Sequence, residues 1–186
     1  GTQTPAQQPG FLPLGSDHAG GIVDLLLVYQ GGLHRIDWTQ EHFKPAVSWK
    51  NPRTQQEQWL FDGFLFLELK DNRGHEFAPG YGEKSATRKQ WEWYLDRLFQ
   101  NRVSLSALDA ATSATIARIG PPPRPRRVIL TLFDPVHGQK NWGKIDGRNL
   151  DFTKNEDRSA AATWLIEQLE SRWKKANFQH LELAGF

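Results

Sequence analysis

Residues 59–70 read WLFDGFLFLELK, and this apolar stretch decides the fold. Most of its side chains are aromatic or aliphatic, the types that are enriched in β-strands. Side chains alternate between the two faces of a strand. The two faces therefore consist of Asp62, Phe64, Phe66 and Glu68, and of Phe61, Leu65, Leu67 and Leu69. Both are apolar in the middle, which indicates a strand buried on both sides, as in parallel sheets covered by helices.

Strand-like and helical segments alternate along the rest of the chain. Three further strands are expected at residues 22–29, 128–133 and 181–185. Helices are expected near residues 38–43, 85–100, 105–119 and 155–176, because apolar residues there recur at helical spacing or follow capping residues. This alternation predicts an α/β fold in which four parallel strands follow one another in chain order.

Several residues predict where the helices begin and end. Asp37 and Ser104 are expected to cap the first and third helices. Thr153 and Glu156 have the spacing of a capping box for the last helix. Pro45 is expected to limit the first helix.

The chain divides into a lead-in and one domain. Residues 1–20 are rich in Pro, Gly and Gln without an apolar period, which predicts a flexible or surface-lying segment. Residues 21–186 form a single β/α domain of ordinary size. Its two long connections, residues 71–84 and 135–152, are of a length that is uncommon without a function.

Composition excludes several classes of function. The chain has no Cys, so it contains neither disulfides nor a thiolate nucleophile. A net charge of +2 gives no reason to expect a nucleic-acid partner, and no apolar run is long enough to span a membrane. The histidines lack a metal-site spacing and there is no nucleotide-binding loop, so neither a metal nor a cofactor is expected.

Five segments carry a resemblance to a known family. They are LLLVYQG, WLFDGFLFLE, WEWYLDRLF, NWGKIDGRNLDF and the terminal LELAGF. Together, over residues 17–186, they resemble domain-of-unknown-function family 4855, found mainly in secreted proteins of Bacteroidetes. The resemblance implies a (β/α) barrel of the glycoside-hydrolase type, and a location that is secreted, periplasmic or at the cell surface. The chain starts at Gly1 rather than Met, which indicates a processed or engineered N-terminus, with removal of a signal peptide as one explanation.

Four strands amount to half of an eight-stranded barrel. The chain therefore resembles the N-terminal half of a TIM barrel, with a truncated barrel and a smaller open α/β sheet as alternatives. In longer relatives the acid expected to be catalytic by barrel analogy lies beyond the position of Phe186. We expect the missing half to be replaced by a partner or by self-association, because a half barrel leaves one sheet edge and one face uncovered.

Candidate catalytic residues follow from strand polarity. Sites in parallel α/β proteins lie at the carboxyl ends of strands, and Gln30, Glu68 and Asp134 end the three clear strands. If their common face is the barrel interior, the side chains converge. Neighbouring strands are ~4.8 Å apart, so Glu68 and Asp134 could approach the ~5–5.5 Å of a retaining carboxylate pair. The alternatives are that the carboxylates cap or form ion pairs, and that Gln30 bonds loop backbone.

Loop aromatics complete the candidate site. Tyr81 and Trp142 lie on the two long loops, where an aromatic face can stack on a sugar ring. Gln30 and His137 are the polar residues of the same substrate-binding group. Two interpretations stay open: a glycoside-hydrolase-like protein acting on a polysaccharide or oligosaccharide, and a non-catalytic carbohydrate-binding or scaffold domain. Gln30, Glu68, Asp134 and Trp142 in one cleft would favour the enzyme.

Overall fold

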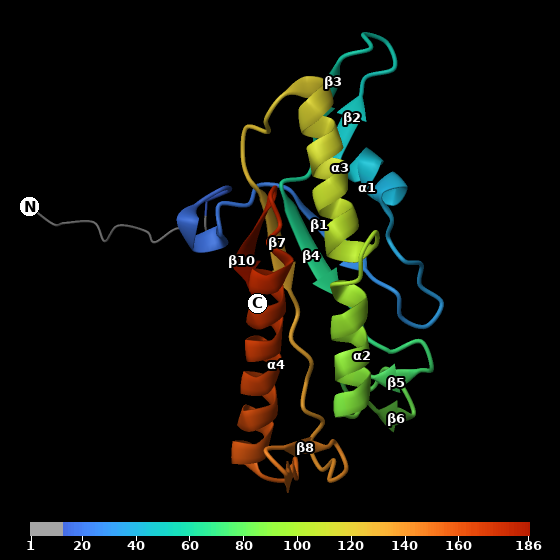
Figure 1. Ribbon diagram of the computed structural model, residues 1–186, viewed down its shortest axis with the longest axis vertical. Coiled ribbons are helices and arrows are strands. Elements are labelled where there is room, and N and C mark those ends of the chain that lie inside the picture. The colour runs from blue at the N-terminus through green and yellow to red at the C-terminus, as the bar shows by residue number, and fades with distance from the viewer. Residues whose placement is uncertain (1–12) are drawn as a thin grey trace, which may run out of the picture.

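A four-stranded parallel sheet forms the centre of the computed structural model, which describes residues 13–186 (Figure 1). Its strands are β1 (Leu25–Tyr29), β4 (Gly63–Leu67), β7 (Arg126–Leu130) and β10 (Leu181–Gly185). They lie in the order β1-β4-β7-β10 and every neighbouring pair is parallel. The prediction of an α/β fold with parallel strands in chain order is confirmed.

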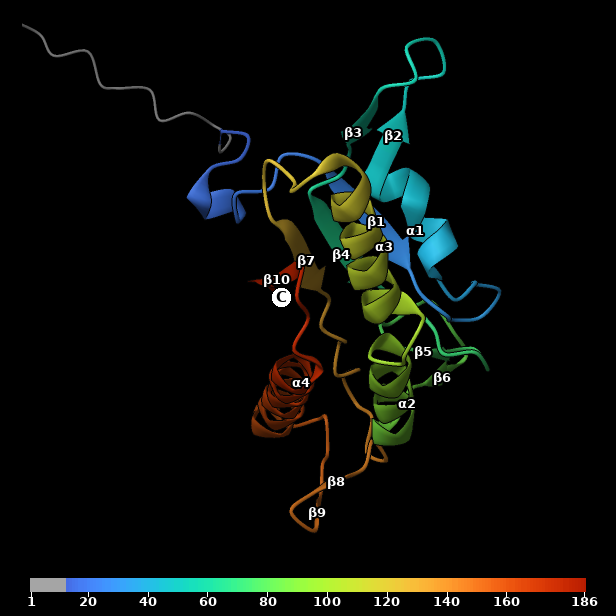
Figure 2. The same ribbon diagram turned by 45° about the horizontal axis from the view of Figure 1, so that its top comes forward.

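Residues 13–186 also contain four α-helices: α1 (Gln40–Val47), α2 (Arg88–Leu98), α3 (Ser104–Ile119) and α4 (Asn155–Ala176). Helix α3 passes in front of the sheet and α1 lies beside α3, whereas α2 and α4 extend beyond the carboxyl edge of the sheet (Figures 1 and 2). Arg172 of α4 reaches Asp96 of α2 at 2.6 Å, which links these two helices at the surface.

The core lies between the sheet and the helices. Fully buried side chains on this face are Val28, Phe64, Phe66, Val128 and Leu130. Phe43 of α1 packs on the middle of β4, with its ring centroid 6.2 Å from those of both Phe64 and Phe66. Phe64 and Phe66 of β4 therefore pack against α1, and burial of each such side chain contributes about 1.5–3 kcal/mol.

The opposite face of the sheet is only partly covered. Leu25 and Leu27 of β1 are 45% and 42% exposed. Leu65 and Leu67 of β4 are half-buried, so the expectation of a strand buried equally on both faces is wrong here. The face that carries Glu68 is the one that the helices cover. The strand-end residues consequently lie against helices and loops rather than above a barrel interior.

Short strands occupy three segments between the main elements. The antiparallel pair β2 (Ser48–Lys50) and β3 (Glu57–Trp59) forms a hairpin between α1 and β4. Within the first long connection, β5 (His75–Glu76) pairs in parallel with β6 (Lys84–Ser85). Within the second, β8 (Lys144–Ile145) and β9 (Arg148–Asn149) form a small hairpin.

Helix α1 begins and ends differently from the prediction. Its N-cap is Thr39, whose backbone N–H donates to His42 Nδ1 at 3.1 Å, and not Asp37. Pro45 lies inside the helix instead of limiting it. A proline in the sixth helical position removes one backbone hydrogen bond, and the buried neighbours Ala46 and Val47 show that packing outweighs this loss.

The other helix ends show how local hydrogen bonds compete. The N-cap of α4 is Lys154, and the Thr153 hydroxyl donates to Asp151 at 2.7 Å instead of capping the helix. Ser104 is the first residue of α3 rather than its cap. The bounds of α4 nevertheless agree with the predicted 155–176. No helix within residues 13–186 has both the length and the apolar character that crossing a membrane requires.

The predicted lead-in is described only from residue 13, so the interpretation of residues 1–12 lies outside the described range. Residues Asp17–Ala19 form a short 3-10 helix, η1. The carbonyl of Gly20 then accepts a hydrogen bond from the Arg127 guanidinium, which ties this segment to β7. The last part of the lead-in is thus bonded to the sheet.

Candidate functional site

Gln30 ends β1 and holds the loop that follows it. Its side chain is fully buried, and its Nε2 donates to Asp37 Oδ1 at 2.9 Å. Its Oε1 accepts from the backbone N–H of Trp38 at 3.0 Å. The Asp37 carboxylate also accepts a hydrogen bond from the Arg97 guanidinium of α2 at 2.5 Å and forms an ion pair with it. Both ends of the amide are used within the protein, so Gln30 positions the β1–α1 loop, as the structural alternative held.

Glu68 is buried beneath that loop. Its carboxylate is 3% exposed and accepts the backbone N–H of Leu69 at 2.8 Å and of Gly32 at 3.1 Å. Loss of hydration raises the pKa of Glu68, and the backbone donors oppose this rise without cancelling it. A Cβ at position 32 would overlap the Glu68 carboxylate and lie 2.5 Å from the Lys70 carbonyl oxygen. Only glycine fits over the carboxylate.

Tyr94 of α2 is the second buried polar group in this region. Burial raises the pKa of its hydroxyl, and the nearby negative charge of Glu68 raises it further. Among residues 13–186 the hydroxyl has no hydrogen-bond partner. The ring packs on Phe77 and Phe133, at centroid distances of 5.6 and 5.2 Å. Glu68 and Tyr94 thus share an enclosed, largely aromatic environment.

Asp134 does not lie beside Glu68. The Phe77 backbone runs between the extensions of β4 and β7: its N–H donates to the Leu69 carbonyl at 2.9 Å, and its carbonyl accepts the Asp134 N–H at 3.0 Å. The ~4.8 Å spacing of directly paired strands, on which the predicted carboxylate pair depends, therefore does not apply at this position. Asp134 is exposed whereas Glu68 is buried, so the two carboxylates face different surroundings.

Trp142 belongs to the core and not to a sugar-stacking surface. It is 1% exposed, and its ring lies 5.0 Å from Trp91, 5.5 Å from Phe152 and 5.6 Å from Trp164. This cluster fills the space between α2 and α4. The expectation that Trp142 contacts a ligand is not met in this arrangement, because no face of the ring is open.

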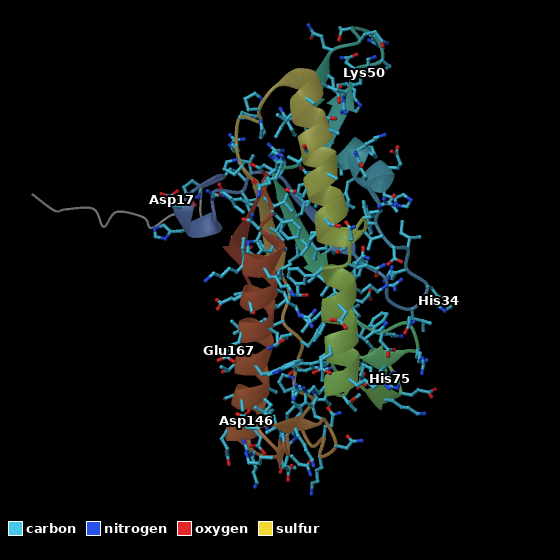
Figure 3. All side chains as sticks on the ribbon, viewed as in Figure 1. Asp17, His34, Lys50, His75, Asp146 and Glu167 are labelled. Atoms are coloured by element: carbon cyan, nitrogen blue, oxygen red, sulfur yellow. The ribbon has the colours of Figure 1, made fainter. Side chains whose placement is uncertain are left out.

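The open part of the site is a cleft among the loops at the carboxyl edge. Its volume is about 510 Å³, and we call it the loop cleft. It is lined by Leu33, Lys70, Arg73, Gly74, His75, Gly82, Glu83 and Lys84. His75 projects from this side of the molecule (Figure 3). Tyr81 precedes the lining residue Gly82 and is 47% exposed, so its position on an accessible loop agrees with the sequence analysis.

A second hollow, the adjoining cleft, shares His75 and Lys84 with the loop cleft. It has a volume of about 590 Å³ and is also lined by Ser85, Thr87, Val136, His137, Gly138, Gln139, Lys140 and Asn141. The structure therefore brings His137 and His75 to one hollow from the two long connections. Of the predicted substrate-binding residues, Tyr81 and His137 are accessible here, while Gln30 and Trp142 are buried.

Two acids fold the loop that walls the loop cleft. The Glu76 carboxylate accepts the backbone N–H groups of Tyr81 at 3.0 Å and Gly82 at 2.9 Å. Asp71 accepts the His75 backbone N–H at 2.8 Å and lies 2.7 Å from its Nδ1. Neither acid was predicted as a functional residue, although their position in a glycine-rich loop, DNRGHEFAPGYG, is a signal for side chains that organise a turn.

No group of three or more potential metal-ligating side chains is found in the described part of the chain. A comparison with known protein families matches residues 24–186 to the family described as Domain of unknown function (DUF4855). The chain belongs to this family. Neither the curated proteins nor the solved structures give a match. The DUF4855 resemblance carried by the five segments is confirmed.

Proposed function

We propose that this DUF4855 domain is a carbohydrate-binding domain whose ligand lies in the loop cleft, without being cleaved by these residues. The observation that carries the proposal is the open cleft at the carboxyl edge of a parallel sheet, lined by Gly82, whose neighbour in the chain, Tyr81, is exposed. Ligands of open α/β sheets bind at this edge. Polar side chains and backbone around a hollow suit sugar hydroxyls, and an exposed aromatic ring suits the apolar face of a sugar.

The position of the carboxylates favours binding over hydrolysis. Glycosidases place two carboxyl groups ~5–9.5 Å apart on either side of the scissile bond. Glu68 is sealed by Gly32, and the Phe77 backbone separates the β4 extension from Asp134. A sugar in the loop cleft would not contact the Glu68 carboxylate while the β1–α1 loop keeps this conformation.

The proposal includes a location outside the cytoplasm and self-association of the domain. A secreted or cell-surface location fits a polysaccharide ligand. The partly open sheet face with Leu25 and Leu27 fits the half-barrel interpretation and self-association. Sedimentation at micromolar concentration tests self-association, and a clean monomer would contradict it.

The test is binding of a panel of polysaccharides, measured by affinity electrophoresis and calorimetry. We expect Tyr81→Ala to weaken binding of a recognised glycan by roughly 2- to 10-fold, the size of one aromatic contact. Trp49→Ala is the matched control, because Trp49 is similarly exposed but lies on the β2–β3 hairpin at the other end of the molecule (Figure 1). Equal losses in both variants would contradict the proposed site.

Glycoside hydrolysis is the second candidate function, favoured by one observation. The raised pKa of the Glu68 carboxyl, caused by its burial, favours the protonated form that a general acid uses. If the wild type cleaves any glycan, Glu68→Gln should lower turnover by ~10²–10⁴-fold with binding retained. If the wild type binds a glycan without releasing products, this candidate is eliminated.

A further inference from the structure

The loop cleft is lined by more positive than negative side chains. Lys70, Arg73 and Lys84 line it together with one carboxylate, Glu83. We propose that the loop cleft and the adjoining cleft bind an anionic glycan, through carboxylate or sulfate groups on its sugar units. This inference rests on the proposed function in that the ligand is a carbohydrate, and it adds the chemical class.

The three cations are not neutralised by the protein itself. Within residues 13–186, none of Lys70, Arg73 and Lys84 forms an ion pair. Arg73 and Lys84 are exposed and Lys70 is half-buried. Their charge is therefore available to a ligand, and a hollow lined by an excess of positive charge attracts anions.

The neighbouring acids do not cancel this field at the opening. Asp71 and Glu76 are buried and turned toward the loop, where backbone N–H groups and the His75 ring occupy them. A carboxylate that is held by internal donors contributes little to an outside ligand. Glu83 is the one acid that lines the opening, and it can accept hydrogen bonds from hydroxyl groups.

The positive surface continues into the adjoining cleft. Lys84 and His75 line both hollows, and the adjoining cleft adds Lys140 and His137. Among the described residues Lys140 also forms no ion pair. Two connected hollows with separate cations suit a chain that carries repeated negative charges better than they suit a single small anion.

The basic cluster at Arg124, Arg126 and Arg127 differs from this surface. Arg126 is buried and donates to backbone carbonyls of Phe61 and Arg124. Arg127 contacts Gly20 and Glu182, and Arg124 lies 3.8 Å from Asp62. These arginines connect parts of the fold. Lys70, Arg73 and Lys84 at the carboxyl edge have no such ion pair within the described residues.

Hydroxyl partners favour a glycan over a nucleic acid. The clefts combine their cations with Glu83, Ser85 and Asn141, groups that bind sugar hydroxyls. A net charge of only +2 for the whole chain is small for a protein that follows a phosphate backbone. A sugar acid or sulfated sugar matches both kinds of partner.

The experiment uses two pairs of probes: polygalacturonate with its fully methyl-esterified form, and dextran sulfate with dextran. Within each pair the sugar backbone is the same and the charge differs. We expect binding of at least one charged member, weakening as salt is raised, and binding at least ~10-fold weaker for its neutral partner. The two pairs distinguish carboxylate from sulfate recognition.

Charge-reversal variants test whether the charged probe binds in the loop cleft. The double variant Lys70→Glu with Lys84→Glu should bind the charged probe at least ~10-fold more weakly, because repulsion replaces attraction. The matched control, Lys50→Glu with Lys174→Glu, changes the same charge on the hairpin and on α4 and should bind normally; Lys50 lies at the opposite end of the molecule (Figure 3). Should the double variant not fold, Lys84→Ala, at an exposed position, serves with a smaller expected loss.

The outcomes separate the two proposals. Equal affinity for charged and neutral members would overturn the anionic class and leave carbohydrate binding standing. Binding to none of the four probes, or equal loss in both double variants, would overturn the anionic-glycan site, whereas carbohydrate binding as such would still be decided by the wider panel and Tyr81→Ala. Double-stranded DNA bound as tightly as polygalacturonate at the same salt concentration would overturn the choice of a glycan.

Discussion

The two ends of β4 each carry a buried carboxylate, and the two are stabilised differently. Asp62 precedes the strand and is 4% exposed, and Glu68 follows it and is 3% exposed. Asp62 accepts the backbone N–H of Asp24 at 2.8 Å and has the Arg124 guanidinium at 3.8 Å. Glu68 accepts two backbone N–H groups, and no cation of the described residues comes within ion-pair distance.

This difference separates a stabilising edge from a binding edge. At the amino edge, the Asp62 carboxylate accepts hydrogen bonds from the backbone just before β1 and pairs with Arg124 just before β7. It thereby connects the starts of β1, β4 and β7. At the carboxyl edge, Glu68 is held by backbone N–H groups without an ion-pair partner among the described residues, and cations without ion pairs line the cleft nearby. Parallel α/β folds commonly divide stability and function between these two edges.

The largest loss of stability is expected when the Asp62 carboxylate at the amino edge of the sheet is removed. Asp62→Ala should lower the free energy of unfolding by about 3 kcal/mol, the size reported for a buried charge that loses its partner. The charged form of buried Arg126 is favoured by Asp62, and the N–H groups of Val23 and Asp24 would lose their acceptor. Urea unfolding measures the loss. Asp24→Ala, at an exposed side chain, is the control, and similar losses in both variants would contradict the interpretation.

The second largest loss of stability is expected from a substitution in the loop that covers Glu68. Gly32→Ala should cost about 1–3 kcal/mol, because the added methyl group overlaps Glu68 and the Lys70 carbonyl. Combining it with Glu68→Ala should recover part of this cost, since one of the two obstacles is removed. A double-mutant cycle in urea measures the coupling. Strictly additive losses would mean that the loop does not rest on the carboxylate.

A smaller effect depends on pH. The raised pKa of Glu68 means that the folded protein binds the proton more tightly than the unfolded chain, whose ordinary value is 4.5. Wild-type stability therefore falls as pH rises from 4.5 through the folded pKa. Glu68→Gln lacks this group, so its stability relative to wild type should increase over that interval and then stay constant. Unfolding curves from about pH 4 to about pH 8 measure this, and a pH-independent difference would contradict burial of the charge.

The smallest loss of stability is expected from breaking an ion pair, the one between Glu57 and Arg118. Glu57 of β3 lies 2.7 Å from Arg118 of α3, whose hydrogen bond, with that of Ser48, lowers the pKa of Glu57 to about 2. Arg118→Ala should cost about 0.2–1 kcal/mol near neutral pH, because the pair is partly exposed. This contribution is present above the unfolded value of 4.5 and is lost as pH falls toward 2. Calorimetry at several pH values tests it, with Arg53→Ala on the same hairpin as the control.

The sequence predicted the sheet because the sheet depends on long, regular patterns. Alternating apolar strands and helices determine parallel order, and the bounds of α4 follow from a 22-residue helical pattern. It could not decide which face of β4 meets the helices, since both faces are apolar. The covered face proved to be the one with Phe64, Phe66 and Glu68, which changes the surroundings of every strand-end residue.

The candidate site was less predictable because it depends on contacts between distant loops. Phe77 enters between β4 and β7 through backbone hydrogen bonds, which no side-chain pattern announces. Trp142 lies in a glycine-rich segment without periodicity, so its burial between α2 and α4 has no local signal. Whether Lys70, Arg73 and Lys84 form ion pairs likewise depends on where acidic side chains from other segments lie in the folded protein, which the sequence does not show.

The order of the strands also governs how the chain reaches its folded state. Leu25 pairs with Gly63, Gly63 with Arg127, and Arg126 with Leu181, so no pairing in the sheet is local. Each contact must first close a long loop at an entropic cost, whereas the β2–β3 hairpin and the α3 helix can form in microseconds. We therefore expect refolding in the millisecond-to-second range, with helices gained before the sheet. During ribosomal synthesis, β1 must wait without a strand partner until β4 has left the exit tunnel.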